Sequence, residues 1–235
     1  MTTFVLVHGA WSGAHSYRRV RPLLARHGHE VFTPCLTGLG ERAHLVSPQV
    51  GLATHVEDVV NVVVYEDLRD IVLVGHSYGG AVVTSAVERI GERVRHLVYL
   101  DAFVPRDGES VWGMLGLPPG ETAAVAPGEW LVPPAPREYA TPEETAWATP
   151  RRRPHPVRTL RDPIRLSRPL AEHAFGLTYV KATDDGRDAV GGHAFWDAAE
   201  LARDDPRWSY REIPTNHMVQ HNAPEALVEI LLSLA

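Results

Sequence analysis

The chain has 235 residues, which suits one large domain or one domain with a sizeable insertion. Hydrophobic residues make up 44% and charged residues 22%, the balance of a folded globular protein and not of a disordered one. A formal net charge of −6 argues against a nucleic-acid or anionic-membrane partner, because both need a basic face. The single cysteine, Cys35, excludes an internal disulfide framework and a cysteine-rich zinc site.

The sequence contains no apolar run near the roughly 20 residues that a membrane-spanning helix needs, so no membrane partner is expected. The first strand begins almost at once, in M-T-T-F-V-L-V, with no basic and apolar leader before it. A cytoplasmic location is therefore the expectation.

Short apolar runs alternate with longer amphipathic segments at both ends of the chain. The apolar runs predict strands at Phe4–Val7, Glu30–Thr33, Ile71–Val74, His96–Leu100, Leu177–Ala182 and Trp208–Ile213. The amphipathic segments predict helices at His15–His27, His55–Glu66 with Thr54 as N-cap, Gly80–Ile90, Ala194–Arg203 and Pro224–Leu234. Unbroken apolar strands separated by helices indicate an α/β fold with about six mostly parallel strands, covered on both faces.

The middle of the chain has a different composition. Thirteen of the 19 prolines lie between Pro105 and Pro169, together with Trp112, Trp130 and Trp147. Proline at this density prevents long helices, whereas the tryptophans argue against disorder. We therefore expect a core of residues 1–103 and 176–235 and an inserted lid of residues 104–175. A loose linker between two domains is disfavoured, because the 60 residues that follow could hardly fold alone.

The strongest local signal is G-x-S-x-G at Gly75, His76, Ser77, Tyr78 and Gly79, placed after a predicted strand and before a predicted helix. That context is the one required by the nucleophile elbow of α/β-hydrolases. A serine on such a tight, strained turn projects its hydroxyl above the sheet, and side chains at the glycines would collide with neighbouring elements. Ser77 is the predicted nucleophile, the alternative being a serine that only caps the helix.

A nucleophile of this kind needs two backbone N–H groups directed at the oxyanion. In this fold one belongs to the residue after the nucleophile, here Tyr78, and the other to the loop after the first strand. Ala10 is the predicted donor in H-G-A-W, with Trp11 as the second choice. His8 is expected to support this loop through hydrogen bonds and to take no part in the chemistry.

The triad of an α/β-hydrolase runs serine, acid, histidine along the chain. His217 follows the last predicted strand and is the predicted base, whereas His221 should face elsewhere. Asp185 is the first choice of acid, followed by Asp184, with Asp188 and Asp101 as weaker candidates. A metal bound by His217 and His221 is not expected, because the glutamate of H-E-x-x-H and a third ligand are missing.

At these residues the sequence resembles one α/β-hydrolase group, that of plant methylesterases, hydroxynitrile lyases and bacterial salicylate-ester and tertiary-alcohol esterases. The matching segments are F-V-L-V-H-G-A-W-S-G, T-G-L-G-E-R-A-H-L, G-L-A-T-H-V-E-D-V, V-L-V-G-H-S-Y-G-G, L-V-Y-L-D-A-F-V-P and the segment around His217. The resemblance is thin between Glu109 and Arg152. It implies a six-strand core, a triad of Ser77, Asp185 and His217, and N–H donors from Ala10 and Tyr78.

Two departures from the plant lyases bear on the reaction that the resemblance implies. Those lyases carry a threonine where this chain has Gly9, and a lysine where it has Met218. Gly9 leaves room for a tetrahedral acyl intermediate, and Met218 cannot supply the charge that stabilises a departing cyanide. Both departures favour ester hydrolysis over cleavage of a carbon–carbon bond.

We expect a substrate pocket that accepts a compact apolar or aromatic group. The candidate substrate-binding residues are Trp11, His15, Phe103, Trp112, Trp130 and Met218. Met114, Leu115, Leu117, Trp147 and His193 are further candidates, and Arg151, Arg152 and Arg153 could meet a substrate carboxylate or form a solvated face.

These observations predict a serine carboxylesterase that hydrolyses a small methyl or aryl ester through an acyl-enzyme, with no cofactor and no metal. A lyase, cyclase or thioesterase using the same triad is the first alternative. A non-catalytic ligand-binding homologue is the second. The expected partner is a small ester, not a nucleic acid or a membrane, and the oligomeric state is open, a homodimer included.

Overall fold

The computed structural model describes residues 1–117 and 129–235 of the chain. Its centre is a six-stranded sheet in the order β2-β1-β3-β4-β7-β8, in which every neighbouring pair is parallel. The strands are β1 (Thr3–Val7), β2 (Glu30–Phe32), β3 (Ile71–His76), β4 (Val94–Leu100), β7 (Gly176–Ala182) and β8 (Trp208–Ile213). The predicted parallel α/β sheet is thereby confirmed, with each strand within two residues of its expected bounds.

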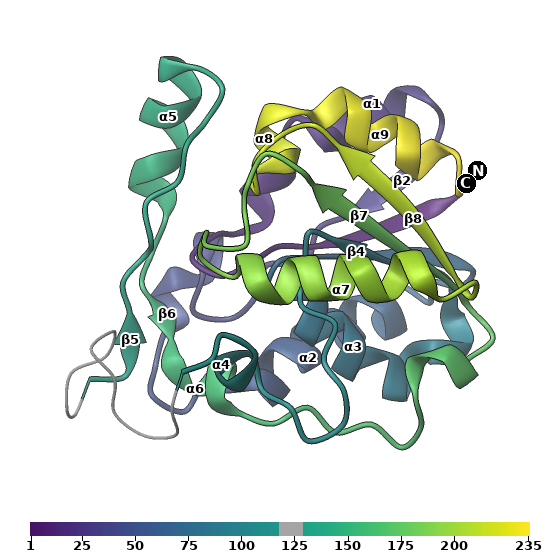
Figure 1. The fold of residues 1–235 in the computed structure, drawn as a ribbon, viewed down its shortest axis with the longest axis horizontal. Helices are drawn as coiled ribbons and strands as arrows, with labels where there is room; N and C mark the ends of the chain where they lie inside the picture. Colours follow the sequence, from purple (N-terminus) through teal and green to yellow (C-terminus); the bar gives the residue numbers. More distant parts are fainter. Residues whose placement is uncertain (118–128) are drawn as a thin grey trace.

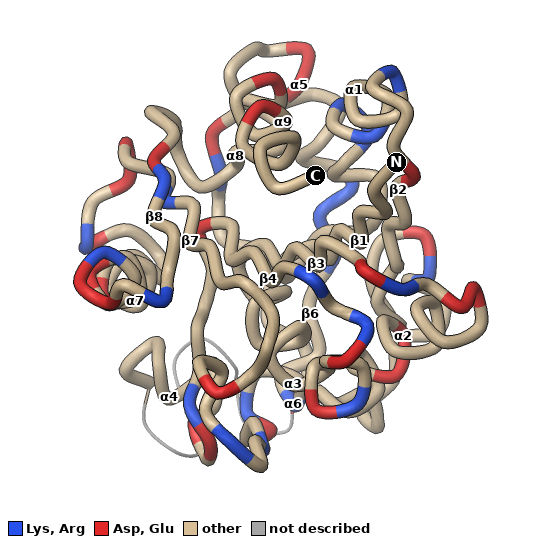
Figure 2. Tube along the Cα trace, turned by 90° about the vertical axis from the view of Figure 1, so that its right-hand side faces the viewer, with Lys and Arg blue, Asp and Glu red and all other residues tan. Residues whose placement is uncertain are grey.

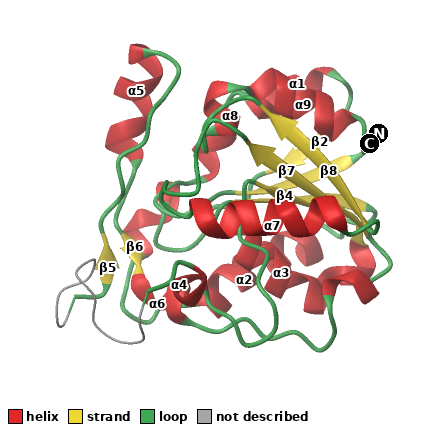
Figure 3. Cartoon of the chain, viewed as in Figure 1, coloured by secondary structure: helices red, strands yellow, loops and turns green. Residues whose placement is uncertain are grey.

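Helices cover both faces of this sheet, as Figure 3 shows. One face carries α1 (Val20–Arg26) and α9 (Pro224–Leu232), and the other carries α2 (Leu52–Tyr65), α3 (Gly79–Ile90) and α7 (Gly192–Asp204). The buried apolar side chains accordingly form two clusters, one on each side of the strands. A sheet covered in this way requires strands that are apolar on both faces, and all six residues of β3 are buried.

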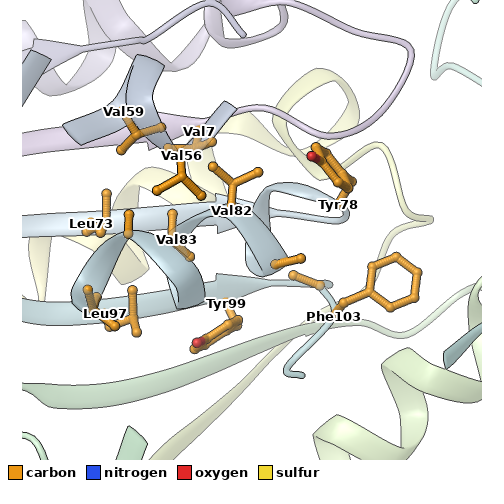
Figure 4. Packing of buried hydrophobic residues seen from close by; sticks show 14 of the residues in the cluster. Val7, Val56, Val59, Leu73, Tyr78, Val82, Val83, Leu97, Tyr99 and Phe103 are labelled. Atoms are coloured by element: carbon orange, nitrogen blue, oxygen red, sulfur yellow. The ribbon is translucent and has the colours of Figure 1, made fainter. Parts of the chain in front are cut away.

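The packing of α3 on the sheet fixes the position of the turn between β3 and α3. Val82 and Val83 of α3 are fully buried beside Leu73 of β3, close to Tyr78 at the start of the helix (Figure 4). Burying such side chains contributes roughly 1.5–3 kcal/mol each. The turn that carries Ser77 therefore lies between two well-anchored elements.

Two predicted helices begin more than two residues away from the expected position. The segment predicted as one helix at His15–His27 is a short 3-10 helix at Ala14–Tyr17 followed by α1. Helix α2 begins at Leu52 with Gly51 as N-cap, so the assignment of Thr54 as N-cap is wrong. The amide of Leu52 donates to Asp162 Oδ2 at 3.0 Å, so a side chain from a distant segment caps the helix, and Thr54 Oγ1 accepts the amide of Gly51 at 3.4 Å.

Between β4 and β7 the chain leaves the sheet and forms α4 (Val111–Met114), β5 (Leu131–Val132), α5 (Pro142–Ala148), β6 (His155–Pro156) and α6 (Val157–Arg161). Strands β5 and β6 pair antiparallel. We call residues 129–156 the arm, which lies beyond the carboxyl ends of the sheet strands in Figure 1. The division into a core and a lid at residues 104–175 stays a prediction.

The charged residues are spread over the outer helices and loops, with the two signs interspersed (Figure 2). None of the helices in the described part of the chain is both long enough and apolar enough to cross a bilayer.

Candidate active site

Ser77 lies on the turn between β3 and α3 and has a left-handed backbone with φ of 55°. For a non-glycine residue this conformation costs about 1–2 kcal/mol and needs surrounding contacts to hold it. Those contacts are present: the Ser77 amide donates to Leu100 O at 3.2 Å, and the Ser77 carbonyl accepts from the amides of Gly80 and Phe103. The turn presents the hydroxyl above the carboxyl end of the sheet.

The glycines of the motif allow this turn to approach its neighbours. A Cβ at Gly75 would lie 2.7 Å from Gly79 O and 2.7 Å from Val83 Cγ2, and a Cβ at Gly79 would lie 2.7 Å from Val7 O. Such distances are shorter than any van der Waals contact, so no side chain fits at either position. The steric reason expected for these glycines is therefore present in the structure.

Ser77, His217 and Asp101 are connected by two hydrogen bonds. His217 Nε2 lies 2.9 Å from Ser77 Oγ, and His217 Nδ1 lies 2.7 Å from Asp101 Oδ2. His217 is in the loop between β8 and the short helix α8 (Val219–Asn222), and Asp101 directly follows β4. With the ring proton on Nδ1, Nε2 is free to accept the hydroxyl proton of Ser77.

Asp185, the first choice of acid, does not contact the imidazole. Its Oδ2 instead accepts the backbone N–H of His217 at 2.8 Å. Asp101 reaches the ring because β4 neighbours β3, and Asp101 takes a left-handed turn, with φ of 42°, at the end of β4. The expected contact between Asp185 and the ring is thus corrected to Asp101. Asp184 and Asp188 form no hydrogen bond to the ring either.

Burial and charge set the protonation of this pair. Burial alone would raise the pKa of Asp101, but His217 and Lys181 hold it below its usual range. Burial lowers the pKa of His217 from its ordinary value, although the hydrogen bond and charge of Asp101 oppose this effect. The arrangement favours an ionised Asp101 beside a neutral His217, the state in which the imidazole can act as a base.

Two side chains around this group were not singled out from the sequence. Lys181 of β7 donates to the second oxygen of Asp101, Oδ1, at 2.7 Å. His76 Nε2 lies 2.9 Å from His217 O, and the two rings are 4.6 Å apart. The one available signal was that Lys181 is the only lysine of the chain, placed at the end of an apolar strand.

The two predicted oxyanion donors lie beside the nucleophile. Ala10 lines the same cavity as Ser77, and Tyr78 follows it directly. Within the described part of the chain, neither amide donates to a protein acceptor, so both are free to bind an oxygen. His8 Nδ1 lies 2.9 Å from Gly9 O, and its Nε2 accepts the amide of Leu36 at 3.1 Å. The expected supporting role of His8 is consistent with these contacts.

Trp11 connects this loop to the arm. Its indole donates to Val132 O at 2.9 Å, and its carbonyl accepts the amide of Arg153 at 3.3 Å. The arm also contributes Arg137, Tyr139 and Arg152 to the cavity above Ser77. The cavity has a volume of about 20 Å³, room for roughly one water molecule, so an ester can enter only when side chains move aside.

The predicted pocket residues divide into two groups. Trp11, His15 and Met218 line the cavity at Ser77, whereas Phe103, Trp112 and Trp130 do not. The latter three pack against the hydrophobic core, which satisfies their apolar surface without a ligand. His193, with Met114, Leu115 and Leu117, lines a separate surface hollow. The expected apolar pocket is therefore not formed at the nucleophile, where polar side chains dominate instead.

Two other features lie outside this chemistry. A more voluminous cavity, of about 560 Å³, lies between residues 104–107 and 166–171, and neither Ser77 nor His217 lines it. Burial raises the pKa of Cys35 to about 11, and its thiol contacts Glu41. A thiol in that state is a poor nucleophile.

A strained serine after a parallel strand, a histidine before the last helix and a buried carboxylate together define the class of α/β-hydrolases. The model of the alpha/beta hydrolase family matches residues 4–230, so the chain belongs to that family.

The chain is 38% identical over 251 residues to the carbendazim hydrolyzing esterase of a Nocardioides species, with 100% of both chains covered. It is 33% identical to Arabidopsis thaliana methylesterase 1 over 43% of this chain and 40% of that protein. Among solved structures, an extracellular Paenibacillus α/β-hydrolase matches with a TM-score of 0.81, 22% identity and coverage of 100% and 99%. At that identity the last match supports the shared fold alone.

Proposed function

We propose that the chain is a serine carboxylesterase that hydrolyses a small ester through an acyl-enzyme. Ser77 is the nucleophile, His217 the general base, and Asp101 the acid that orients and stabilises the imidazolium. The observation that carries this proposal is the continuous hydrogen-bonded connection from Ser77 Oγ through His217 to Asp101, at 2.9 and 2.7 Å. The esterase and methylesterase names of the relatives support the same reaction.

In the first half of the reaction, Ser77 Oγ attacks the ester carbonyl while its proton passes to His217 Nε2. The carbonyl oxygen becomes an oxyanion, which the amides of Ala10 and Tyr78 bind. Because these amides are already in place before the reaction, they stabilise the charge without reorganisation. His217 then donates its proton to the alcohol, which departs and leaves Ser77 acylated.

In the second half, water attacks the acyl-enzyme. His217 Nε2 takes a proton from that water, and the same two amides bind the second oxyanion. Collapse of the intermediate returns the proton to Ser77 and releases the acid. Asp185 holds the backbone of His217 and so fixes the loop that carries the imidazole.

The proposal is tested by labelling with a neutral organophosphonate and by a panel of methyl and aryl esters. We expect stoichiometric labelling and ester turnover in the wild type, and neither in Ser77→Ala. Labelling at Ser77 without turnover of any ester would favour a lyase, cyclase or thioesterase. Absence of labelling would refute the nucleophile, and tight ligand binding without turnover would indicate a binding protein.

The expected cytoplasmic location also stays a prediction, to be checked by fractionation of the producing cell. The Paenibacillus protein with this fold is described as extracellular, so the fold does not by itself imply a cytoplasmic location.

A further inference from the structure

Two arginines of the arm, Arg137 and Arg152, line the cavity that contains Ser77 and His217. Arg152 is held by its own segment, because its guanidinium donates to the carbonyl of Ala135. Arg137 forms no hydrogen bond or ion pair with any residue in the described ranges. It is nevertheless half-buried, so part of its hydration has been lost without a protein group in its place.

The charge around this cavity is not balanced. Its lining, within the described ranges, contains no aspartate and no glutamate. The carboxylates behind it already have partners: Asp101 binds His217 and Lys181, Asp185 binds the His217 amide, and Glu144 binds Arg18 and His221. The charge of Asp185 faces only a neutral amide and so offsets one of the two guanidinium groups, which still leaves the space above the nucleophile with a net positive charge.

Desolvation makes this positive charge costly until an anion arrives. Burial lowers the pKa of the Arg137 guanidinium, against the opposing charges of Asp185 and Asp101. An arginine still remains protonated at neutral pH, so a half-buried Arg137 without a partner is an unsatisfied cation. A carboxylate satisfies a guanidinium best, through two parallel N–H···O bonds.

We propose that Arg137, assisted by Arg152, binds a carboxylate of the substrate, so that the preferred ester carries a negative charge near the scissile bond. This inference rests on the proposed esterase function of Ser77. It changes the expected substrate class, since a polar, cationic cavity replaces the apolar pocket anticipated from the tryptophans. Carboxylate binding would also bring the ester carbonyl toward Ser77, because both groups face the same cavity.

The test uses pairs of esters that differ in one charge. The pair 4-acetoxybenzoate and 4-acetoxybenzamide places the charge on the alcohol part, and monophenyl adipate with the phenyl ester of adipic monoamide places it on the acyl part. Each pair is assayed with the wild type, Arg137→Gln, Arg137→Lys and Arg152→Gln. Arg151→Gln is the matched control, because Arg151 lies over the Trp147 ring and does not line the cavity.

In at least one pair we expect the wild type to prefer the carboxylate, with kcat/KM higher by about tenfold or more. Arg137→Gln should lower kcat/KM for the charged ester by a larger factor than for its neutral partner and so abolish the preference, whereas Arg137→Lys should retain part of it. Arg152→Gln should weaken the preference, and Arg151→Gln should preserve it. Labelling of each variant by a neutral phosphonate shows that its site is folded.

A wild type without preference for the charged member in both pairs would overturn the inference. The same holds if Arg137→Gln slows the charged and neutral esters equally, since Arg137 would then act only on the structure. If the wild type labels at Ser77 but shows no charge preference, the esterase proposal survives alone. If Ser77 neither labels nor turns over any ester, the function proposal fails and the substrate proposal fails with it.

Discussion

Lys181 Nζ lies 2.7 Å from Asp101 Oδ1, and the two side chains are 1% and 0% exposed. The ammonium also donates to Ala182 O and lies 4.5 Å from the centre of the Trp196 ring. The two oxygens of Asp101 are thus divided between Lys181 and His217. An ion pair that is this deeply buried is costly to break, because removing one partner leaves the other as an unpaired buried charge.

Replacing Lys181 by Met should affect both stability and catalysis. Loss of the cation leaves the Asp101 charge less balanced, and we expect a loss of about 3–5 kcal/mol of stability. Because Lys181 holds the pKa of Asp101 down, its removal should strengthen the pull of Asp101 on the His217 proton. The acid limb of the kcat/KM profile should then move to higher pH. A lower melting temperature with an unmoved limb would mean that Lys181 is only structural.

Asp101→Asn and Asp185→Asn should have very different effects on turnover. An asparagine at Asp101 cannot stabilise the imidazolium, so kcat should fall by about 10³–10⁴-fold. An asparagine at Asp185 can still accept the His217 amide through its carbonyl oxygen, so the loss should stay within about tenfold. The two variants are compared by steady-state kinetics on one ester. A larger loss in Asp185→Asn would assign the triad acid to Asp185.

The activity of the wild type should persist below neutral pH. His217 must be neutral to accept the Ser77 proton, and its pKa is lowered from the ordinary 6.5 mainly by burial. Activity is lost only as the pH falls through this lowered pKa, so the midpoint of the acid limb should lie below 6.5. Brief pH-jump assays at constant ionic strength separate this titration from unfolding. A midpoint above 6.5 would contradict the observed environment.

Stability should decline between pH 7 and pH 5, before most carboxylates titrate. Burial lowers the pKa of His8 and of His55 to about 4, and burial also places the pKa of His155 well below 6.5. In the unfolded chain these rings take up protons near pH 6.5, whereas the folded protein keeps them neutral. The contribution of these rings to stability is therefore fully present above pH 6.5, and it is lost as the pH falls toward their pKa values in the folded protein.

His8 and His55, each with a pKa lowered from 6.5 to about 4, should each contribute about 3 kcal/mol of stability that is lost between these two pH values, at 1.36 kcal/mol for each pH unit. Urea unfolding at pH 7.5, 6.5 and 5.5 measures the slope and hence the number of protons taken up. His155→Gln should flatten the slope, because it removes one of the buried rings. Equal stability at all three pH values would show that these rings gain no protons on unfolding.

Gly75→Ala should damage the protein far more than Gly113→Ala. The new Cβ at Gly75 would meet Gly79 O and Val83 Cγ2 at 2.7 Å, so the turn of Ser77 must shift. We expect a loss of about 1–3 kcal/mol and a large fall in kcat. A Cβ added at Gly113, in helix α4, would lie 3.5 Å from its nearest neighbour, Ser110 Oγ, so Gly113→Ala should be neutral or slightly stabilising. Similar melting temperatures for the two variants would argue against close packing at the turn.

The sequence alone determined the sheet, its parallel strands and the expectation of Ser77 and His217 as partners. These features follow from short-range patterns: buried strands are apolar along their length, and G-x-S-x-G encodes a turn that only glycines permit. The same patterns located His217 by its place between the last strand and the last helix. Short-range patterns were enough to pair Ser77 with His217, because both residues follow strands whose carboxyl ends lie at the same edge of the parallel sheet.

Only the tertiary structure decided which acid reaches the ring, what covers Ser77 and how helix α2 is capped. Asp101 and Asp185 both follow strands of the sheet, and Asp185 was expected to be the acid because it follows the penultimate strand. The choice depends on strand neighbours and on a single left-handed turn at Asp101. Arg137, Lys181 and the Asp162 cap act across more than 30 residues of separation, and no local pattern encodes such contacts. These contacts form only when the chain packs, because segments far apart in the sequence then determine the space and the charge around each side chain.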